Sequence, residues 1–148
     1  LVSGAAAVSP RGRSLLQESA ALAEQGKWRR IAREQISAFY PGPFGTTVLA
    51  GIAWLFPSLY GEPDEPSYYM RLCSIVAEAD LRVRSKDVSA KALVIVGERD
   101  VIYPPEVARE TALLLADGDL VIIPRAGHGV FKSHASRINK LIASTMNT

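Results

Sequence analysis

The run Ala-Leu-Val-Ile-Val-Gly at residues 92–97 decides the fold class. A continuous apolar run that ends at a glycine is typical of a strand buried on both faces of a parallel sheet. Pro104, Pro105 and Glu106 follow it closely, and proline is tolerated at the first helical position. We therefore expect a helix to begin here, and we expect Gly118 to end it.

A second buried strand is predicted at residues 120–123, Leu-Val-Ile-Ile. Ser133 is a candidate N-cap for a last helix. The apolar residues of that helix recur at helical spacing and predict an inner face made of Ile138, Leu141, Ile142 and Met146. The order strand, helix, strand, helix predicts an α/β fold with a parallel sheet.

Residues 9–87 show a different pattern, which is typical of helices broken by turns. Ser14 has the spacing of a capping box at a helix start, and Gly26 suits a C-terminal cap. Residues 28–39 place most of their apolar side chains on one helical face. The spacing of the apolar residues between 69 and 76 predicts a further helix.

Composition narrows the class of protein. The chain has 148 residues, of which 48% are hydrophobic and 22% charged, so it is a globular chain of one domain and not a disordered or collagenous one. The net charge of +2 is too small to predict nucleic acid as a partner. The longest apolar run, residues 48–56, is too short to span a membrane. Cys73 is the one cysteine, which favours a reducing compartment such as the cytoplasm.

Two polar residues follow the two predicted strands. Asp100 comes just after the first strand, and His128 stands between two glycines just after the second. Because the carboxyl ends of parallel strands meet at one sheet edge, where ligands bind in such folds, the two side chains are expected to lie close together. An Asp beside a His can fix the ring tautomer and stabilise the imidazolium. Alternatively, Asp100 is a turn residue and His128 a solvated loop residue. No set of metal ligands at recognisable spacing is present.

The stretches around these residues, 92–106 and 120–129, resemble the C-terminal third of an α/β-hydrolase. In that superfamily a strand ending in G-x-x-D brings the triad acid, and a strand followed by G-H brings the triad histidine. Asp100 and His128 match these two motifs. The resemblance also implies that residues 1–8 form a core strand, that residues 9–87 form an inserted helical cap, and that residues 88–148 form the C-terminal part of the core.

The nucleophile elbow of that family, G-x-S-x-G, is absent from the 148 residues. Ser3, Ser9 and Ser14 do not stand in such a motif. In the family's chain order the nucleophile precedes the acid and the histidine. The resemblance therefore implies the C-terminal portion of a longer hydrolase, with no nucleophile in this chain and no activity of the chain alone. It implies no metal or organic cofactor.

The substrate is expected to be a small apolar molecule with an ester or a related bond. Four aromatic residues of the expected cap are candidates to line its pocket: Phe44, Trp54, Phe56 and Tyr60. Alternatively, these residues hold the cap helices together. The same scaffold also serves epoxide hydrolases, dehalogenases, carbon–carbon hydrolases, peroxidases and cofactor-free oxygenases, as well as non-catalytic ligand-binding or structural modules.

Overall fold

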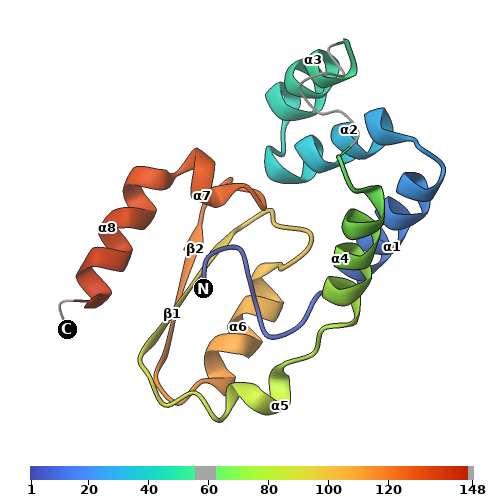
Figure 1. The fold of residues 1–148 in the computed structure, drawn as a ribbon. Coiled ribbons are helices and arrows are strands. Elements are labelled where there is room, and N and C mark those ends of the chain that lie inside the picture. Colours follow the sequence, from blue (N-terminus) through green and yellow to red (C-terminus); the bar gives the residue numbers. More distant parts are fainter. Residues whose placement is uncertain (56–62, 147–148) are drawn as a thin grey trace.

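A computed structural model describes residues 1–55 and 63–146, and it leaves out the side chains of residues 53 and 54. Figure 1 shows two strands with helices around them and a helical layer at one end. The elements in chain order are α1 (Pro10–Glu24), α2 (Trp28–Phe39), a π-helix (Phe44–Leu49), α3 (Ala50–Leu55), α4 (Pro66–Glu78), α5 (Arg82–Ser85), β1 (Ala92–Gly97), α6 (Pro105–Leu114), β2 (Gly118–Ile123), α7 (Val130–Ser133) and α8 (Ala135–Met146).

The two strands pair in parallel, as the sequence predicts. Their register runs from Ala92 opposite Gly118 to Gly97 opposite Ile123. The N-terminal segment adds to the other side of β1 through a parallel bridge between Val2 and Ile95. The spatial order is therefore N-terminal segment, β1, β2, and all three run in the same direction.

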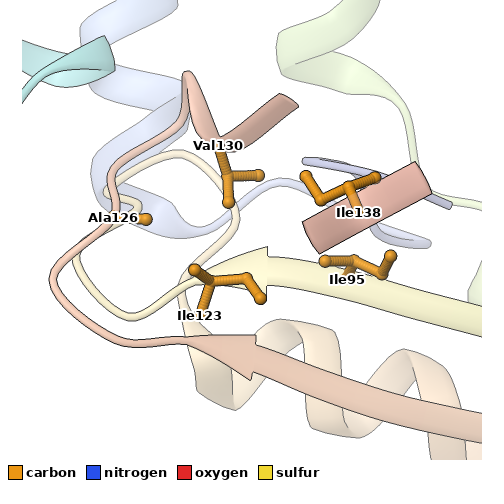
Figure 2. Packing of buried hydrophobic residues seen from close by; sticks show 5 residues of the cluster. All are labelled: Ile95, Ile123, Ala126, Val130 and Ile138. Atoms are coloured by element: carbon orange, nitrogen blue, oxygen red, sulfur yellow. The ribbon is translucent and has the colours of Figure 1, made fainter. Parts of the chain in front are cut away.

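Helices cover both faces of the strands (Figure 1). On one face Val94 and Val96 of β1 pack against the small residues Ala108 and Ala112 of α6. On the other face Ile95 and Ile123 pack with Val130 of α7 and Ile138 of α8, as Figure 2 shows. Burial on both faces explains why β1 is an uninterrupted apolar run with no alternation.

The helical layer, α1 to α4, differs from the prediction at its first helix. α1 begins at Pro10 with Ser9 as its N-cap, whose hydroxyl accepts a hydrogen bond from the amide of Gly12. The predicted cap, Ser14, lies inside the helix, where its hydroxyl donates to the carbonyl of Pro10. The earlier start is favoured because Pro10 occupies the first helical position. Gly26 has a φ of +66° just after the helix, as a C-terminal cap requires.

Three expectations for the second half are wrong. Gly118 does not end α6, which ends at Leu114, but is the first residue of β2. A Cβ at this position would lie 2.3 Å from the carbonyl oxygen of Ala112 in α6, so the close approach favours glycine. Ser133 is the last residue of α7 and does not cap α8. Ile142 and Met146 are exposed, Met146 to 81%. The sheet side of α8 is occupied by Ile138 and Leu141 alone, because only these two reach the core cluster.

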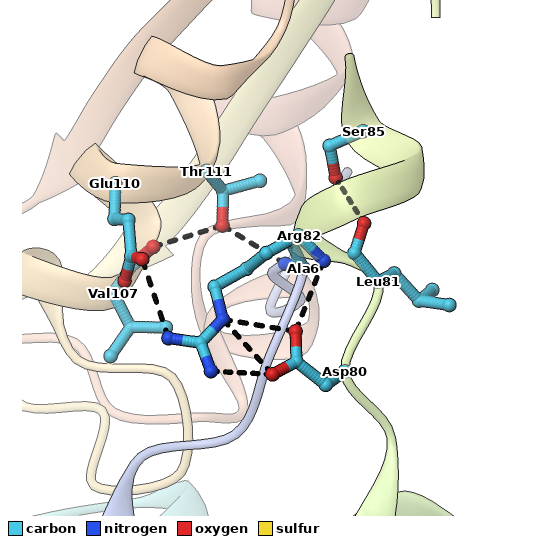
Figure 3. Close-up of polar contacts among 8 residues, drawn as sticks. All are labelled: Ala6, Asp80, Leu81, Arg82, Ser85, Val107, Glu110 and Thr111. Carbon is cyan, nitrogen blue, oxygen red and sulfur yellow. Dashed lines mark hydrogen bonds and ion pairs between the residues drawn. The ribbon is translucent and has the colours of Figure 1, made fainter. Parts of the chain in front are cut away.

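A polar network joins the N-terminal segment to α6 (Figure 3). The Thr111 hydroxyl accepts from the amide of Ala6 at 2.9 Å and donates to the carbonyl of Val107 at 2.9 Å. Arg82 pairs with Asp80 and, at 3.5 Å, with Glu110. This guanidinium lowers the pKa of Asp80 to about 2. The buried Thr111 hydroxyl thus supplies a hydrogen-bond acceptor for the main-chain amide of Ala6, which no neighbouring strand supplies.

No helix among the described residues has both the length and the hydropathy needed to cross a membrane.

Candidate active site

Asp100 is held rigidly at the carboxyl end of β1. Its side-chain Oδ1 accepts hydrogen bonds from the amides of Ile102 at 2.9 Å and Tyr103 at 3.0 Å. The residue is 2% exposed. A carboxylate that closes a turn on its own backbone tolerates little rotation, so its other oxygen, Oδ2, has a defined direction.

His128 stands in the loop after β2, and that loop is bound to the end of α2. The His128 amide donates to the carbonyl of Ala38 at 3.1 Å. A Cβ at Gly127 would lie 2.5 Å from the same carbonyl oxygen and would collide with Pro41. Neither Gly127 nor Gly129 has a positive φ. The reason for glycine at 127 is therefore close approach to the end of α2 and to Pro41.

The hydrogen bond expected between the two side chains is present. His128 Nδ1 lies 2.9 Å from Asp100 Oδ2, and the two side chains are 16% and 0% exposed. The ring of Phe39 packs edge-on against the imidazole at 5.1 Å between centroids, and Tyr103 packs at 5.9 Å. Burial, together with the charge of Asp100, raises the pKa of the Tyr103 hydroxyl.

This geometry determines what the imidazole can do. A carboxylate oxygen only accepts, so Nδ1 donates the proton of this hydrogen bond. In the neutral form of the ring, Nε2 then presents a lone pair. No hydrogen bond within the described part of the chain uses Nε2. A neutral imidazole held in this tautomer is suited to take a proton at Nε2 and return it.

A cavity of about 220 Å³ adjoins His128, between the helical layer and the loops after the strands. Most of its lining is apolar. Besides His128, the lining residues are Leu15, Leu16, Ser19, Glu34, Gln35, Ala38, Phe39, Tyr69, Leu72, Cys73, Val76 and Ile102. Its volume is below the usual range for drug-sized ligands, which begins at about 300 Å³. The cavity is therefore suited to a small, mostly apolar molecule.

Two of the lining residues titrate outside their ordinary range. Burial and the neighbouring Cys73 raise the pKa of Tyr69 to about 12, while the Tyr69 hydroxyl accepts from Gln35 Nε2 at 2.8 Å. Burial also raises the pKa of the Cys73 thiol. Both groups are therefore neutral at physiological pH, and neither is an activated nucleophile.

The four aromatic residues predicted to line the pocket are placed differently or not described. Phe44 is 65% exposed and is not among the residues that line the cavity beside His128. Phe56, Tyr60 and the Trp54 side chain lie outside the described residues. Among the residues that the structure describes, Phe39 and Tyr69 are the aromatic residues that line the cavity. Helical spacing alone assigns these two residues to inner faces, and it does not distinguish a core contact from a cavity wall.

Two of the serines that stand outside an elbow motif, Ser3 and Ser9, make structural hydrogen bonds near the site. Ser3 has a φ of +49°, and its hydroxyl donates to the carbonyl of His128 at 2.6 Å. Ser9 caps α1, and its hydroxyl donates to the carbonyl of Val101 at 2.9 Å. Both hydroxyls support the loops that carry His128 and Asp100. Within the described ranges no cluster of three His, Cys, Asp or Glu side chains is arranged to hold a metal ion.

A family model described as TAP-like protein, of the α/β-hydrolase type, matches residues 69–148. This range is more than half of the chain and contains both Asp100 and His128. The chain belongs to the α/β-hydrolase superfamily. The fold and the family expected from the strand-end motifs are thus confirmed.

This α/β-hydrolase is similar to hydrolases of known sequence and structure. It is 36% identical over 83 residues to the pimeloyl-[acyl-carrier protein] methyl ester esterase of Nitrosomonas europaea, a match covering 55% of this chain and 33% of the esterase. The α/β-hydrolase MGS-M2 from a Medee basin deep-sea metagenome library superposes with a TM-score of 0.86 at 19% identity, covering 99% of this chain and 55% of that one. The enol-lactonase of Burkholderia xenovorans LB400 gives 0.81 at 19% identity, covering 100% and 55%.

The chain spans about half the length of these solved structures, and its match spans about a third of the curated esterase. The two solved structures establish the fold alone, because their identity is low. The esterase match gives this α/β-hydrolase a relative that cleaves an ester.

Proposed function

We propose that this α/β-hydrolase contributes the histidine and the acid of a nucleophile–His–acid triad that cleaves an ester or a related bond in a small, mostly apolar substrate. The observation that carries the proposal is the buried 2.9 Å hydrogen bond between His128 Nδ1 and Asp100 Oδ2, beside a cavity that His128 lines. The esterase relative supports the reaction class.

In the proposed reaction His128 acts twice. Its Nε2 takes the proton of the nucleophile as that group attacks the ester carbonyl, and it gives the same proton to the departing alcohol. It then takes a proton from water, whose oxygen attacks the acyl group, and returns this proton to the nucleophile. Asp100 keeps Nδ1 protonated throughout and stabilises the imidazolium.

The nucleophile of this proposal lies in the part of the relatives that this chain does not span. No G-x-S-x-G motif occurs in the 148 residues, whereas the matching relatives are longer. A serine elbow in the complete reading frame favours ester chemistry. An aspartate in that place favours the dehalogenase or epoxide-hydrolase type, and neither residue favours a non-catalytic module.

The test is hydrolysis of p-nitrophenyl butyrate by the protein of the complete reading frame. Replacing His128 by Ala is expected to lower kcat by at least about a thousandfold, as in other triads. His134→Ala is the matched control, because this second histidine lies between α7 and α8 and bonds to Ser133. The 148 residues alone are expected to show no turnover above their own His128→Ala variant.

Two results would contradict the proposal. Activity in the complete protein that survives His128→Ala within about tenfold would refute the role of His128. Ester hydrolysis by the 148 residues that His128→Ala abolishes would leave that role standing and would refute the location of the nucleophile outside them.

A further inference from the structure

Three separate parts of the chain bind His128. Its amide donates to the carbonyl of Ala38 in α2 at 3.1 Å, and its Nδ1 bonds to Asp100 after β1. Its carbonyl accepts a hydrogen bond of 2.6 Å from the hydroxyl of Ser3, a distance typical of a well-formed O–H···O bond. Both main-chain polar groups and one ring nitrogen of His128 are therefore held, and the position of the imidazole depends on all three contacts.

Ser3 reaches this loop from the segment that pairs with β1. The carbonyl of Leu1 accepts from the amide of Ile95 at 2.8 Å, and the amide of Ser3 donates to the carbonyl of Ile95 at 2.9 Å. The chain bends at Ser3. Pairing with β1 thus fixes the main chain of Ser3, and its side chain connects the sheet to the loop that carries His128.

The backbone of Ser3 has an unfavourable conformation for a serine. Its φ of +49° lies in the left-handed region, which glycine adopts readily and residues with a Cβ adopt at a cost. The bend by itself therefore favours glycine. Serine adds a hydroxyl, and the structure uses that hydroxyl to bind the carbonyl of His128. The hydroxyl thus gives a physical reason for serine at this position.

The second residue with this kind of strain belongs to the same loop. Among the described residues, Ser3 and Arg125 are the non-glycine residues with a positive φ. Arg125, at +59°, stands three residues before His128, and its amide donates to Glu98 Oε2 at 2.7 Å. Backbone strain persists where the surrounding contacts over-determine the conformation, and it clusters at functional sites. Its occurrence on both sides of His128 indicates that the place of this loop is fixed.

We propose that Ser3 is a positioning residue for the triad, and that its hydroxyl holds the main chain of His128 where the imidazole meets Asp100. This inference rests on the proposed function, because it requires His128 to be the group that moves protons. Ser3 is not among the described residues that line the cavity. It therefore acts on the rate of the reaction through His128, and not on binding of the substrate.

Two substitutions of Ser3 separate the hydroxyl from the backbone. Ser3→Ala removes the hydroxyl and keeps a Cβ in the left-handed region, whereas Ser3→Gly removes the hydroxyl and relieves the strain. In hydrolysis of p-nitrophenyl butyrate by the protein of the complete reading frame, both variants are expected to lower kcat by about tenfold or more and to change KM by less than about twofold, because a small misplacement of a catalytic group is costly. Thermal unfolding is expected to give Ser3→Gly a higher Tm than Ser3→Ala, although both lose activity.

Ser85→Ala is the matched control. The Ser85 hydroxyl is also part-buried and also donates to a main-chain carbonyl, that of Leu81 at 2.9 Å. Ser85 belongs to α5 and is not among the described residues that line the cavity beside His128. This variant is expected to retain the wild-type kcat.

Proton NMR of the His128 ring gives a readout that requires no turnover. The resonance of the Nδ1 proton reports the hydrogen bond to Asp100. Both Ser3 variants are expected to shift or broaden this resonance, because the imidazole loses its fixed place beside the carboxylate. Ser85→Ala is expected to leave it unchanged.

The outcomes distinguish the role of Ser3 from the proposed function. A Ser3→Gly variant with wild-type kcat and an unchanged Nδ1 resonance refutes the role of the hydroxyl. A change confined to KM, or a loss of activity that Ser85→Ala reproduces, refutes it as well. If the wild-type protein of the complete reading frame hydrolyses no ester, the proposed function fails, and the resonance alone decides on Ser3: an altered resonance in both variants supports its role, and an unchanged one refutes it.

Discussion

Replacing Asp100 by Asn is expected to abolish catalysis while leaving the fold nearly intact. Oδ1 of Asp100 accepts from two main-chain amides, of Ile102 and Tyr103, so the amide oxygen of an asparagine takes that side. The NH₂ group must then face His128 Nδ1 at the position of Oδ2. Because an NH₂ group only donates, Nδ1 becomes the acceptor and the proton moves to Nε2, where the base is needed.

The expected loss follows from this reversal of the tautomer. The same change in a known triad lowers kcat by about 10⁴-fold, which is about 5.4 kcal/mol of transition-state stabilisation at 1.36 kcal/mol per decade. Stability falls much less, by about 1–2 kcal/mol, because a charged hydrogen bond is replaced by a neutral one. Asp100→Ala leaves both amides unpaired, at about 1–3 kcal/mol each. It is expected to cost about 2–6 kcal/mol, a large part of a typical stability.

The assay pairs ester hydrolysis by the protein of the complete reading frame with urea unfolding of the same variants. The nitrogen chemical shifts of the His128 ring report the tautomer directly by NMR and require no turnover. An Asp100→Asn variant that keeps activity within about tenfold of the wild type, or that keeps the proton on Nδ1, refutes the reasoning. So does an asparagine variant as unstable as the alanine variant.

Three further predictions concern the structure around the site. Thr111→Val should lower the free energy of unfolding by about 1–3 kcal/mol in urea titrations, because the Ala6 amide loses its acceptor in a site that is 2% exposed; an unchanged midpoint would contradict the network of Figure 3. Gly127→Ala should cost about 1–3 kcal/mol through its collision with α2, whereas Gly51→Ala, with open space in α3, should gain up to about 1 kcal/mol; equal effects in thermal unfolding would be inconsistent with close approach as the reason for Gly127. Tyr69, with a pKa raised to about 12, should contribute stability that is present below pH 10 and is lost as the pH rises from 10 to 12; in an ultraviolet titration of the phenolate, Tyr69→Phe should remove absorbance that develops near pH 12, and an unchanged titration there would contradict the raised pKa.

Features that depend on a few neighbouring residues could be predicted from the sequence. The apolar runs of β1 and β2, the helix at residues 28–39 and the meeting of Asp100 with His128 all follow from local pattern and from parallel strand direction. Two side chains that end adjacent parallel strands must share an edge, whatever surrounds them.

Boundaries and faces were harder to predict, because several patterns compete over one stretch of chain. Ser14 has the spacing of a cap, but Ser9 with Pro10 after it forms a better start for α1. Ile142 and Met146 have helical spacing with Ile138, but only the first turns of α8 lie on the sheet. Periodicity predicts which side chains share a face, and it contains no information about how far the covering surface extends.

The tertiary structure alone decided the composition of the candidate site. The sequence by itself determined the sheet, the family motifs and the pair of Asp100 and His128. The cavity wall, in contrast, draws on α1, α2 and α4 as well as the loop at Ile102, and Gly127 matters because α2 approaches it. The pKa of Tyr69 is raised only because packing removes water from the side chain of an otherwise ordinary helix residue. Desolvation is a property of the assembled layers, and no local pattern of residues encodes it.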